Sequence, residues 1–444
     1  MSYFDRPATI APIFASFFAI FLPVCALQIV PNFVEVLPYL FVLNAVGLGI
    51  THFIITLALY FQGPNRDYFN SSPTNRLIYF GIPLAILLFF AVTAAADVRT
   101  TFPAFSLYFF GAIRFFDFFH VGRQSFGMLQ IFRRPLQGRS PSWLRRGENV
   151  FFIGMAAMQW ETFVLNGRFR PDLIYVSLPA IAMAALFCSI VASYLVGEQR
   201  SRSGGRPWVP LAYFVMQALC AASAVYDIRL YLTALAMHYV EYHVIMMPRC
   251  FRAEIDPERW VDRFYARVRR HGPVFFSVLL VVLVVFEMRH HVDTQSFTAT
   301  FLVHIFDGIF FMHYFVDAFL WKFHKPYYKE TLTPLYFSPG ATTGAADHPD
   351  RAGWIAAGVV TAGLFLAWTQ GLLGDAAEEA RRRTIDPIHA RNHLHWGISL
   401  AQRSEWTKAE RHFREAVDRN PENLPAWRLL ETAQKNALIG RRAR

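Results

Sequence analysis

The segment HIFDGIFFMHYFVD, residues 304–317, combines the apolar composition of a membrane helix with two histidines and two aspartates. Ionisable groups are costly in the hydrocarbon core of a bilayer, and those found there usually serve a function. At 100° per residue, His313 and Asp317 share one helix face, Asp307 lies about 80° from Asp317, and His304 lies half a turn from His313. This spacing predicts that His313 and Asp317 act together, whereas His304 has a structural or access role.

Three other apolar segments carry similar polar groups. In each segment these groups share one helix face: His52 and Thr56 in the first; Arg114, Asp117, His120 and Gln124 in the second; and His238, Glu241 and Tyr242 in the third. In the predicted topology, His52, His238 and His313 each lie about nine residues from the inner end of their span, and His120 about twelve. Four histidines from four helices at nearly one depth predict a shared site in the cytoplasmic half of the bilayer.

Imidazoles mixed with carboxylates suit iron, zinc, copper or manganese. The four cysteines form no CxxC pair, which argues against a disulfide framework, a thiolate zinc site and an iron–sulfur cluster. Iron is the expected cofactor, with zinc as the alternative. The predicted metal ligands are His52, His120, His238, His313, Asp317 and Glu241, and the candidate catalytic groups are Glu241, Asp317 and Tyr242.

A histidine that binds a metal needs a hydrogen-bond partner to fix its tautomer, and each candidate has one within about a turn. The expected partners are Thr56 for His52, Asp117 or Gln124 for His120, Glu241 or Tyr242 for His238, and Asp317 for His313, with Asp307 within reach of the site.

Composition determines the setting of this site. Of the 444 residues, 54% are hydrophobic, and many of them fall in runs of about 20 residues, the length that crosses a bilayer. We therefore predict an all-α, polytopic membrane helix bundle over residues 1–373. Its eleven expected spans are 10–30, 37–61, 78–97, 102–132, 150–166, 173–196, 208–224, 229–247, 273–288, 297–322 and 352–373.

Charge sets the predicted orientation. The net charge of +11 is expected to come from basic cytoplasmic loops, such as RRPLQGRSPSWLRR at 133–146, and not from nucleic-acid binding. The positive-inside rule then places the N-terminus in the cytoplasm and the C-terminus outside. The first apolar run is expected to be a retained helix because no small-residue cleavage site follows it. Span 102–132 is too long for one straight crossing, so we expect a break at Gly122 or Gly127, or an end lying along the surface.

Residues 374–444 are polar and predict a small extracytoplasmic helical tail. Within 390–423 and a partial second unit, the tail resembles a tetratricopeptide repeat. The matching positions are Trp396, Gly397, Leu400, Ala409, Phe413, Ala416 and Pro421, followed by Trp427 and Leu430. The resemblance implies a helical hairpin that contacts a protein partner. A hairpin that only caps the last span is the alternative.

The scattered intramembrane histidines give the chain a resemblance to the bacterial carotene-cleaving membrane dioxygenases that form retinal. That resemblance implies that His52, His120, His238 and His313 bind iron, that the substrate is a lipophilic small molecule, and that the protein lies in a bacterial inner membrane. The aromatic runs FFGAIRFFDFF and FDGIFFMHYF would line an apolar slot for such a substrate. The membrane desaturases fit less well because their HxxxH and HxxHH boxes are missing.

Other functions remain open from the sequence. Zinc in place of iron would suit a membrane lipid hydrolase, and two axial histidines would suit a haem protein. A proton-coupled transporter or channel would use Asp307, Asp317 and Glu241 as relay groups, although no internal repeat of the kind common in transporters is evident. The chain could also be a subunit of a larger membrane complex.

Overall fold

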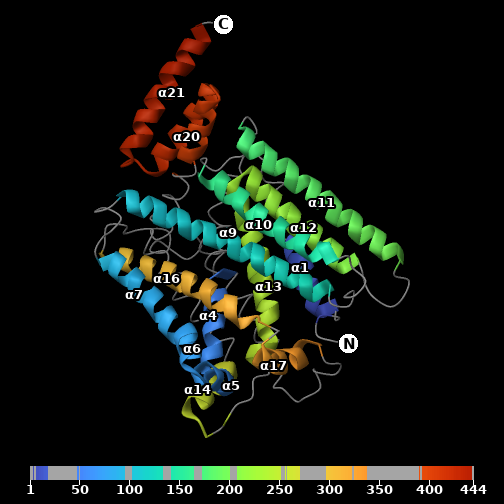
Figure 1. Ribbon diagram of the computed structural model, residues 1–444. Helices are drawn as coiled ribbons and strands as arrows, with labels where there is room; N and C mark the ends of the chain where they lie inside the picture. Colours follow the sequence, from blue (N-terminus) through green and yellow to red (C-terminus); the bar gives the residue numbers. More distant parts are fainter. Residues whose placement is uncertain are drawn as a thin grey trace. The chain divides into compact units, whose positions relative to one another are not determined.

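The computed structural model describes residues 4, 7–18, 48–49, 51–95, 103–133, 142–164, 173–200, 208–251, 256, 258–270, 297–322, 325–337, 390 and 393–442. Within these ranges every regular element is a helix, which confirms the predicted all-α class for this part of the chain (Figure 1). The predicted spans 273–288 and 352–373, and residues 19–47 of the first two spans, lie outside the described residues. The helices up to α17, except the first four residues of α16, and the C-terminal helices belong to two separate compact units.

The helices of the first unit are α1 Pro7–Ser16, α4 Thr51–Leu57, α5 Gly63–Asn70, α6 Pro73–Arg76, α7 Ile82–Ala95, α9 Pro103–Arg133, α10 Ser142–Val164, α11 Ile174–Arg200, α12 Trp208–Tyr226, α13 Tyr231–Phe251, α14 Trp260–Arg270, α16 Phe297–Leu320 and α17 Pro326–Phe337. Three short helical turns connect to these helices. Ala58–Phe61 extends α4, Leu77–Gly81 joins α6 to α7, and Ile228–Leu230 precedes α13. Figure 1 shows α10 lying beside α9, α11 and α12, and these pairs are in contact.

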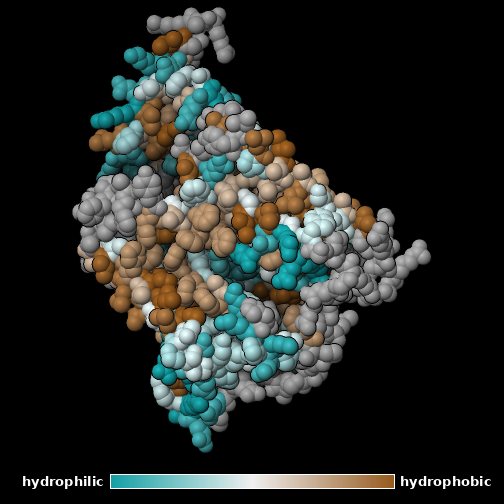
Figure 2. Space-filling model, viewed as in Figure 1, coloured by the Kyte–Doolittle hydropathy of each residue, from teal (hydrophilic) through white to brown (hydrophobic). Residues whose placement is uncertain are grey.

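Three helices among the described residues are long and apolar enough to cross a membrane: Pro73–Ala95, Val176–Val196 and Trp208–Tyr226. They indicate a membrane protein, and they overlap three of the eleven predicted spans. Large apolar side chains on α11 and on the continuous helix Pro73–Ala95, which ends with α7, are exposed, as expected where lipid replaces water around the protein. These side chains are Leu77, Phe80, Leu84, Leu88, Phe89 and Val92, and on α11 Leu178, Ile181, Leu195 and Val196. Figure 2 shows a broad apolar surface over α7.

The long helix α9 does not break at either glycine, contrary to the expectation from its length. It runs for 31 residues from Pro103 to Arg133 without interruption. Gly122 instead allows α9 to approach α10 closely, because a Cβ atom at this position would lie 3.0 Å from the backbone oxygen of Phe152. A methyl group there would push the two backbones apart, so the glycine serves helix packing and not helix termination.

A buried polar cluster joins α9, α10 and α11. The carboxylate of Glu148 on α10 accepts hydrogen bonds from Gln130 and Arg133 of α9, at 2.8 and 3.1 Å, and from the Tyr194 hydroxyl of α11 at 2.6 Å. The side chain of Glu148 is 0% exposed. A buried charge is tolerated only when it is paired and hydrogen-bonded, so this cluster fixes how the three helices dock.

Glu148→Ala is expected to lower the free energy of unfolding by about 3–5 kcal/mol, because it leaves the buried Arg133 without its counter-charge. The double variant Glu148→Leu with Arg133→Met should recover most of that loss, since it removes both charges. Thermal unfolding of the purified chain in detergent measures both. A Glu148→Ala protein as stable as the parent would contradict the structural role of the pair.

The described C-terminal part of the second unit consists of three helices. A helix over residues 393–402 is followed by α20, Trp406–Arg419, and α21, Leu424–Arg442. Gly397 allows the first helix to pack against α20, because a Cβ atom there would lie 2.5 Å from ring atoms of Phe413. The core of these helices consists of Leu400, Ala409, Phe413, Ala416, Val417, Ala426, Leu430 and Ala433. The predicted helical tail is therefore helical where it is described.

Candidate metal centre

Four helices of the first unit each contribute one histidine to a common buried cluster. His52 comes from α4, His120 from α9, His238 from α13 and His313 from α16, and all four side chains are buried. The ring of His52 lies 4.5 Å from that of His313 and 4.7 Å from that of His238, and the rings of His120 and His238 are 5.0 Å apart, measured between centroids. The structure thus brings together the four histidines that the depth argument had grouped.

The closest approach in the cluster joins two imidazoles. Nε2 of His52 lies 2.8 Å from Nε2 of His313. Metal–nitrogen bonds of about 2.1 Å set neighbouring ligand nitrogens on one ion about 3.0–3.4 Å apart. In the structure this contact is a hydrogen bond between the two rings, and its length is close enough to that range for both nitrogens to turn towards one cation with little movement once the shared proton is lost.

A hydrogen-bonded chain assigns the tautomer of His313. The Tyr242 hydroxyl donates its proton to Oδ1 of Asp317 at 2.8 Å. The Thr56 hydroxyl, 2.6 Å from the Tyr242 oxygen, must then be the donor in that pair. Thr56 is left to accept a proton from Nδ1 of His313, which lies 2.8 Å away. Since a neutral imidazole carries one proton, Nε2 of His313 presents a lone pair to the cluster.

Several nitrogens of the cluster lack hydrogen bonds. Nδ1 of His52, Nε2 of His120 and Nδ1 of His238 are buried and have no hydrogen-bond partner among the described residues. Leaving a buried polar atom unsatisfied costs about 1–3 kcal/mol, and such atoms in folded proteins call for an explanation. Three in one cluster fit a metal site, because a bound cation would satisfy those of them that present a lone pair and that no described protein group reaches.

Two overlapping sets of side chains can hold a metal ion. One set consists of His52, His120 and His238, and the other of His120, His313 and Asp317; in each set the possible ligand atoms lie within 4.8 Å of one another. Oδ2 of Asp317 lies 3.8 Å from Nε2 of His313 and 4.0 Å from Nε2 of His120. His120 belongs to both sets and is the geometric link between them.

Glu241, which the sequence analysis had placed among the ligands, lies in neither of these sets. Its carboxylate accepts hydrogen bonds from Tyr213, at 2.9 Å, and from Gln217, both on α12. Gln124 also lies 3.5 Å from it and donates to the backbone oxygen of His238 at 2.9 Å. Glu241 therefore ties α13 to α12 behind His238 and does not face the histidines.

The other expected partners are also distributed differently from the prediction. Thr56 contacts His313 and not the side chain of His52, while Tyr242 contacts Asp317 and not His238. Asp117 accepts hydrogen bonds from Tyr314 at 2.7 Å and from Arg114 at 3.4 Å.

Asp307, expected within reach of the site, is partly buried and belongs to neither ligand set. His304 lies on α16, but its side chain is outside the described residues.

Tyr314 is a residue of the site that is not among the predicted ones. Its ring stacks on His120, with centroids 4.5 Å apart and planes at 29°, and its hydroxyl donates to Asp117. It holds the His120 ring in place, and its own ring also lies 5.9 Å from that of His313. Its position directly after His313 was the available signal, but within an aromatic run it could not be distinguished from a lipid-facing ring.

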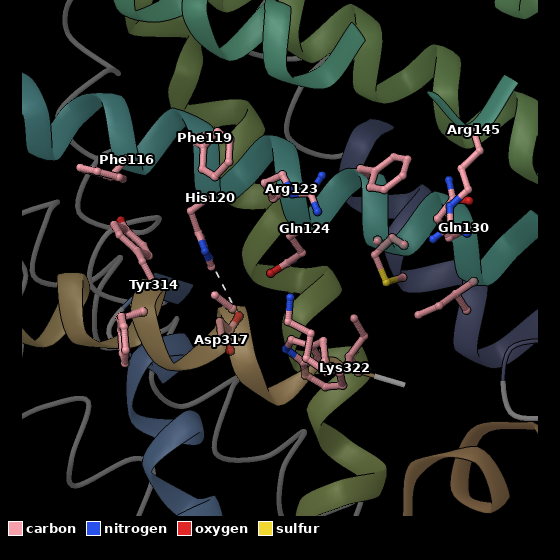
Figure 3. Close-up of a pocket in the computed structure, with 18 of the residues that line it drawn as sticks. Phe116, Phe119, His120, Arg123, Gln124, Gln130, Arg145, Tyr314, Asp317 and Lys322 are labelled. Atoms are coloured by element: carbon pink, nitrogen blue, oxygen red, sulfur yellow. Dashed lines mark ion pairs between the residues drawn. The ribbon is translucent and has the colours of Figure 1, made fainter. Parts of the chain in front are cut away.

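A cavity of about 1100 Å³ opens next to this centre. It reaches His120 and Asp317, and its wall includes the aromatic residues expected to form an apolar slot, among them Phe116, Phe119, Phe311 and Phe315. Figure 3 shows His120 and Asp317 pointing towards each other, 4.0 Å apart, with Phe116, Phe119 and Tyr314 nearby. Ligand sites are usually concave and mostly apolar with a few placed polar groups, and this cavity has that character.

No family model, no curated protein and no solved structure matches this chain. The chemistry of the centre must therefore be inferred from its own side chains.

Proposed function

We propose that this protein is an integral membrane metalloenzyme, a non-haem iron oxygenase or hydroxylase that acts on a lipophilic substrate. The observation that carries the proposal is the set His120, His313 and Asp317 beside an apolar cavity. Two histidines and one carboxylate with open coordination positions are typical of non-haem iron(II) oxygenases. When bound there, iron would supply redox chemistry and a binding position for dioxygen.

The surrounding residues have supporting roles in this proposal. Tyr242 donates to Oδ1 of Asp317 and leaves Oδ2 directed at His120 and His313. Thr56 keeps the proton of His313 on Nδ1, so that Nε2 is available as a ligand. Tyr314 holds the ring of His120, and the phenylalanines of the cavity keep water from the reacting region.

A zinc-dependent lipid hydrolase is the second candidate, and the set His52, His120 and His238 favours it. Three protein ligands and an open fourth position are the usual arrangement of catalytic zinc. Zinc bound in this way would activate a water molecule for attack on an ester or amide. Asp317, close to His120, would then be the nearest candidate to accept a proton.

Metal analysis and an absorption spectrum of the purified chain test these proposals. About one iron per chain without a haem Soret band is the result expected for the oxygenase. Zinc at that ratio would replace the first proposal with the second, and a Soret band would replace both with a haem protein. Folded protein without metal would refute every metalloenzyme proposal and favour the proton-coupled transporter.

We also propose the finer topology: about eleven spans, an N-terminus in the cytoplasm, and a location in the bacterial inner membrane. The arginine-rich segment 133–146 and the positive-inside rule support this orientation. The site helices α9, α13 and α16 have 31, 21 and 24 residues, and at about 1.5 Å per residue each is long enough to cross a hydrocarbon core of about 30 Å.

For the tail we propose an extracytoplasmic tetratricopeptide-like hairpin that contacts a protein partner. The close packing of Gly397 on Phe413 supports this reading, since small residues at such positions let the paired helices of a repeat meet. Trp427 and Leu424 remain 47% and 67% exposed, which leaves apolar surface for a partner.

A further inference from the structure

The lining of the cavity changes character from one end to the other, and both α9 and α16 show the same order. Along α9 the lining residues run from Phe116 through His120 to Arg123, and along α16 and its end from Phe311 through Asp317 to Lys322. Cations therefore line only one side of the metal centre, whereas aromatic side chains line both, with Phe126 and Trp321 on the basic side. Figure 3 shows Phe116 and Tyr314 on one side of the pair His120 and Asp317, and Arg123 and Lys322 on the other.

Two further cations line the basic end. Arg145 comes from the first turns of α10 and Lys329 from α17, so four different segments supply positive charge to one end of the cavity. Arg145, Lys322 and Lys329 form no ion pair with any carboxylate in the described part of the chain. Asp317 is the only acidic residue of the lining, and Tyr242 already donates to it. In Figure 2, a hydrophilic area beside a hollow interrupts the apolar surface over the C-terminal half of α9.

We propose that this cavity binds a lipophilic anion, a long apolar chain ending in a carboxylate or phosphate. The anionic group lies among Arg123, Arg145, Lys322 and Lys329, and the chain extends past the metal centre towards the phenylalanines. The substrate class rests on the proposed function, whereas the binding site does not require it. A neutral polyisoprenoid, such as a carotene, would give Arg145, Lys322 and Lys329 no counter-charge, whereas Arg123 also donates to Asn149 and lies over the ring of Phe126.

The dimensions of the cavity fit such a ligand. From Phe116 to Gln130, both lining residues, α9 rises roughly 21 Å, which matches an extended long-chain acyl group. From Asp317 to Lys322 the rise is only roughly 8 Å. The metal centre therefore faces the chain several carbons away from the anionic group, and the reacting carbon lies in the body of the chain.

Binding of paired probes to the full-length chain in a neutral detergent tests this proposal. Oleate is compared with oleyl alcohol, and dioleoyl phosphatidic acid with dioleoylglycerol, so that each pair differs in the charged group. We expect at least one anion to bind about 10-fold more tightly than its neutral partner, with the preference shrinking as salt is added. The pair that shows the preference identifies the carboxylate or the phosphate lipid as the ligand. Equal binding within both pairs would overturn the proposal.

Variants locate the bound anion. Lys322→Gln with Lys329→Gln should weaken binding of the preferred anion about 3- to 10-fold and leave its neutral partner unaffected. Lys325→Gln is the matched control, because Lys325 lies between them in sequence but does not line the cavity. Ala318→Trp, which fills the cavity beside Asp317, should abolish binding of both members of the pair while the unfolding temperature stays near that of the parent. Anion binding that survives Ala318→Trp would place the ligand elsewhere and refute the site.

Metal content measured on the same samples separates the two proposals. Protein that holds its metal but shows no preference for an anion refutes the lipophilic anion and leaves the metalloenzyme. Protein that prefers the anion but holds no metal refutes the metalloenzyme and keeps the binding site.

Discussion

His313→Ala is expected to remove the metal from the purified protein, with a loss of affinity of at least about 100-fold. Nε2 of His313 lies 2.8 Å from Nε2 of His52. His313 also belongs to the set of two histidines and one carboxylate, and its hydrogen bond to Thr56 assigns its tautomer. No other side chain of the centre has all three properties. Metal analysis of the variant, purified in the same detergent and buffer as the parent, gives the answer.

Glu241→Gln is the control for this experiment. Its neighbours Tyr213 and Gln217 can bond an amide as well as a carboxylate, so the helix contact survives, and we expect full metal content. If Glu241→Gln loses the metal while His313→Ala retains it, the ligand set of the structure is incorrect. Thermal unfolding of both variants shows whether a lost metal reflects a lost fold.

Thr56→Val is expected to weaken metal binding about 10- to 100-fold while leaving every direct ligand in place. Valine has nearly the shape of threonine but no hydroxyl, so Nδ1 of His313 loses its acceptor, and the Tyr242 oxygen loses the Thr56 donor but still donates to Asp317. The His313 proton is then no longer held on Nδ1, and the buried N–H is left unsatisfied. Competition with a chelator of known affinity measures the change.

Thr93→Val on α7 provides the matched control. Thr93 is also a buried threonine, but its hydroxyl donates to the backbone oxygen of Phe90, away from the centre. The same substitution there should leave metal affinity unchanged. Equal losses of affinity in the two variants would mean that Thr56 acts only through packing, which would remove the hydrogen-bonded chain from the account of the site.

The histidine cluster was accessible from the sequence because a bilayer restricts the possibilities. Helices that cross a membrane run nearly parallel, so residues at equal distance from the ends of their spans lie at equal depth. His52, His120, His238 and His313 satisfied that condition, and the structure brings them together. Depth is a single coordinate, however, and cannot tell which side of its helix a neighbouring polar residue faces.

Glu241 and Tyr242 show the limit of that reasoning. Both lie within about a turn of His238, and helix periodicity predicted both on the face that carries His238. Tyr242 faces Thr56 and Asp317, whereas Glu241 faces Tyr213 and Gln217. The choice depends on which helix packs on each side of α13, and no local pattern contains that information.

The sequence by itself determined the helical class and the apolar composition, and it predicted a common depth for the four histidines, because these depend on composition and on spacing along single helices. Only the tertiary structure decided the pairing of His52 with His313, the hydrogen-bonded chain from Asp317 to His313, and the placement of cations at one end of the cavity. Each of these joins side chains from helices far apart in the sequence. Their contacts follow from the rotation of each helix about its axis, which is set by packing against all its neighbours at once.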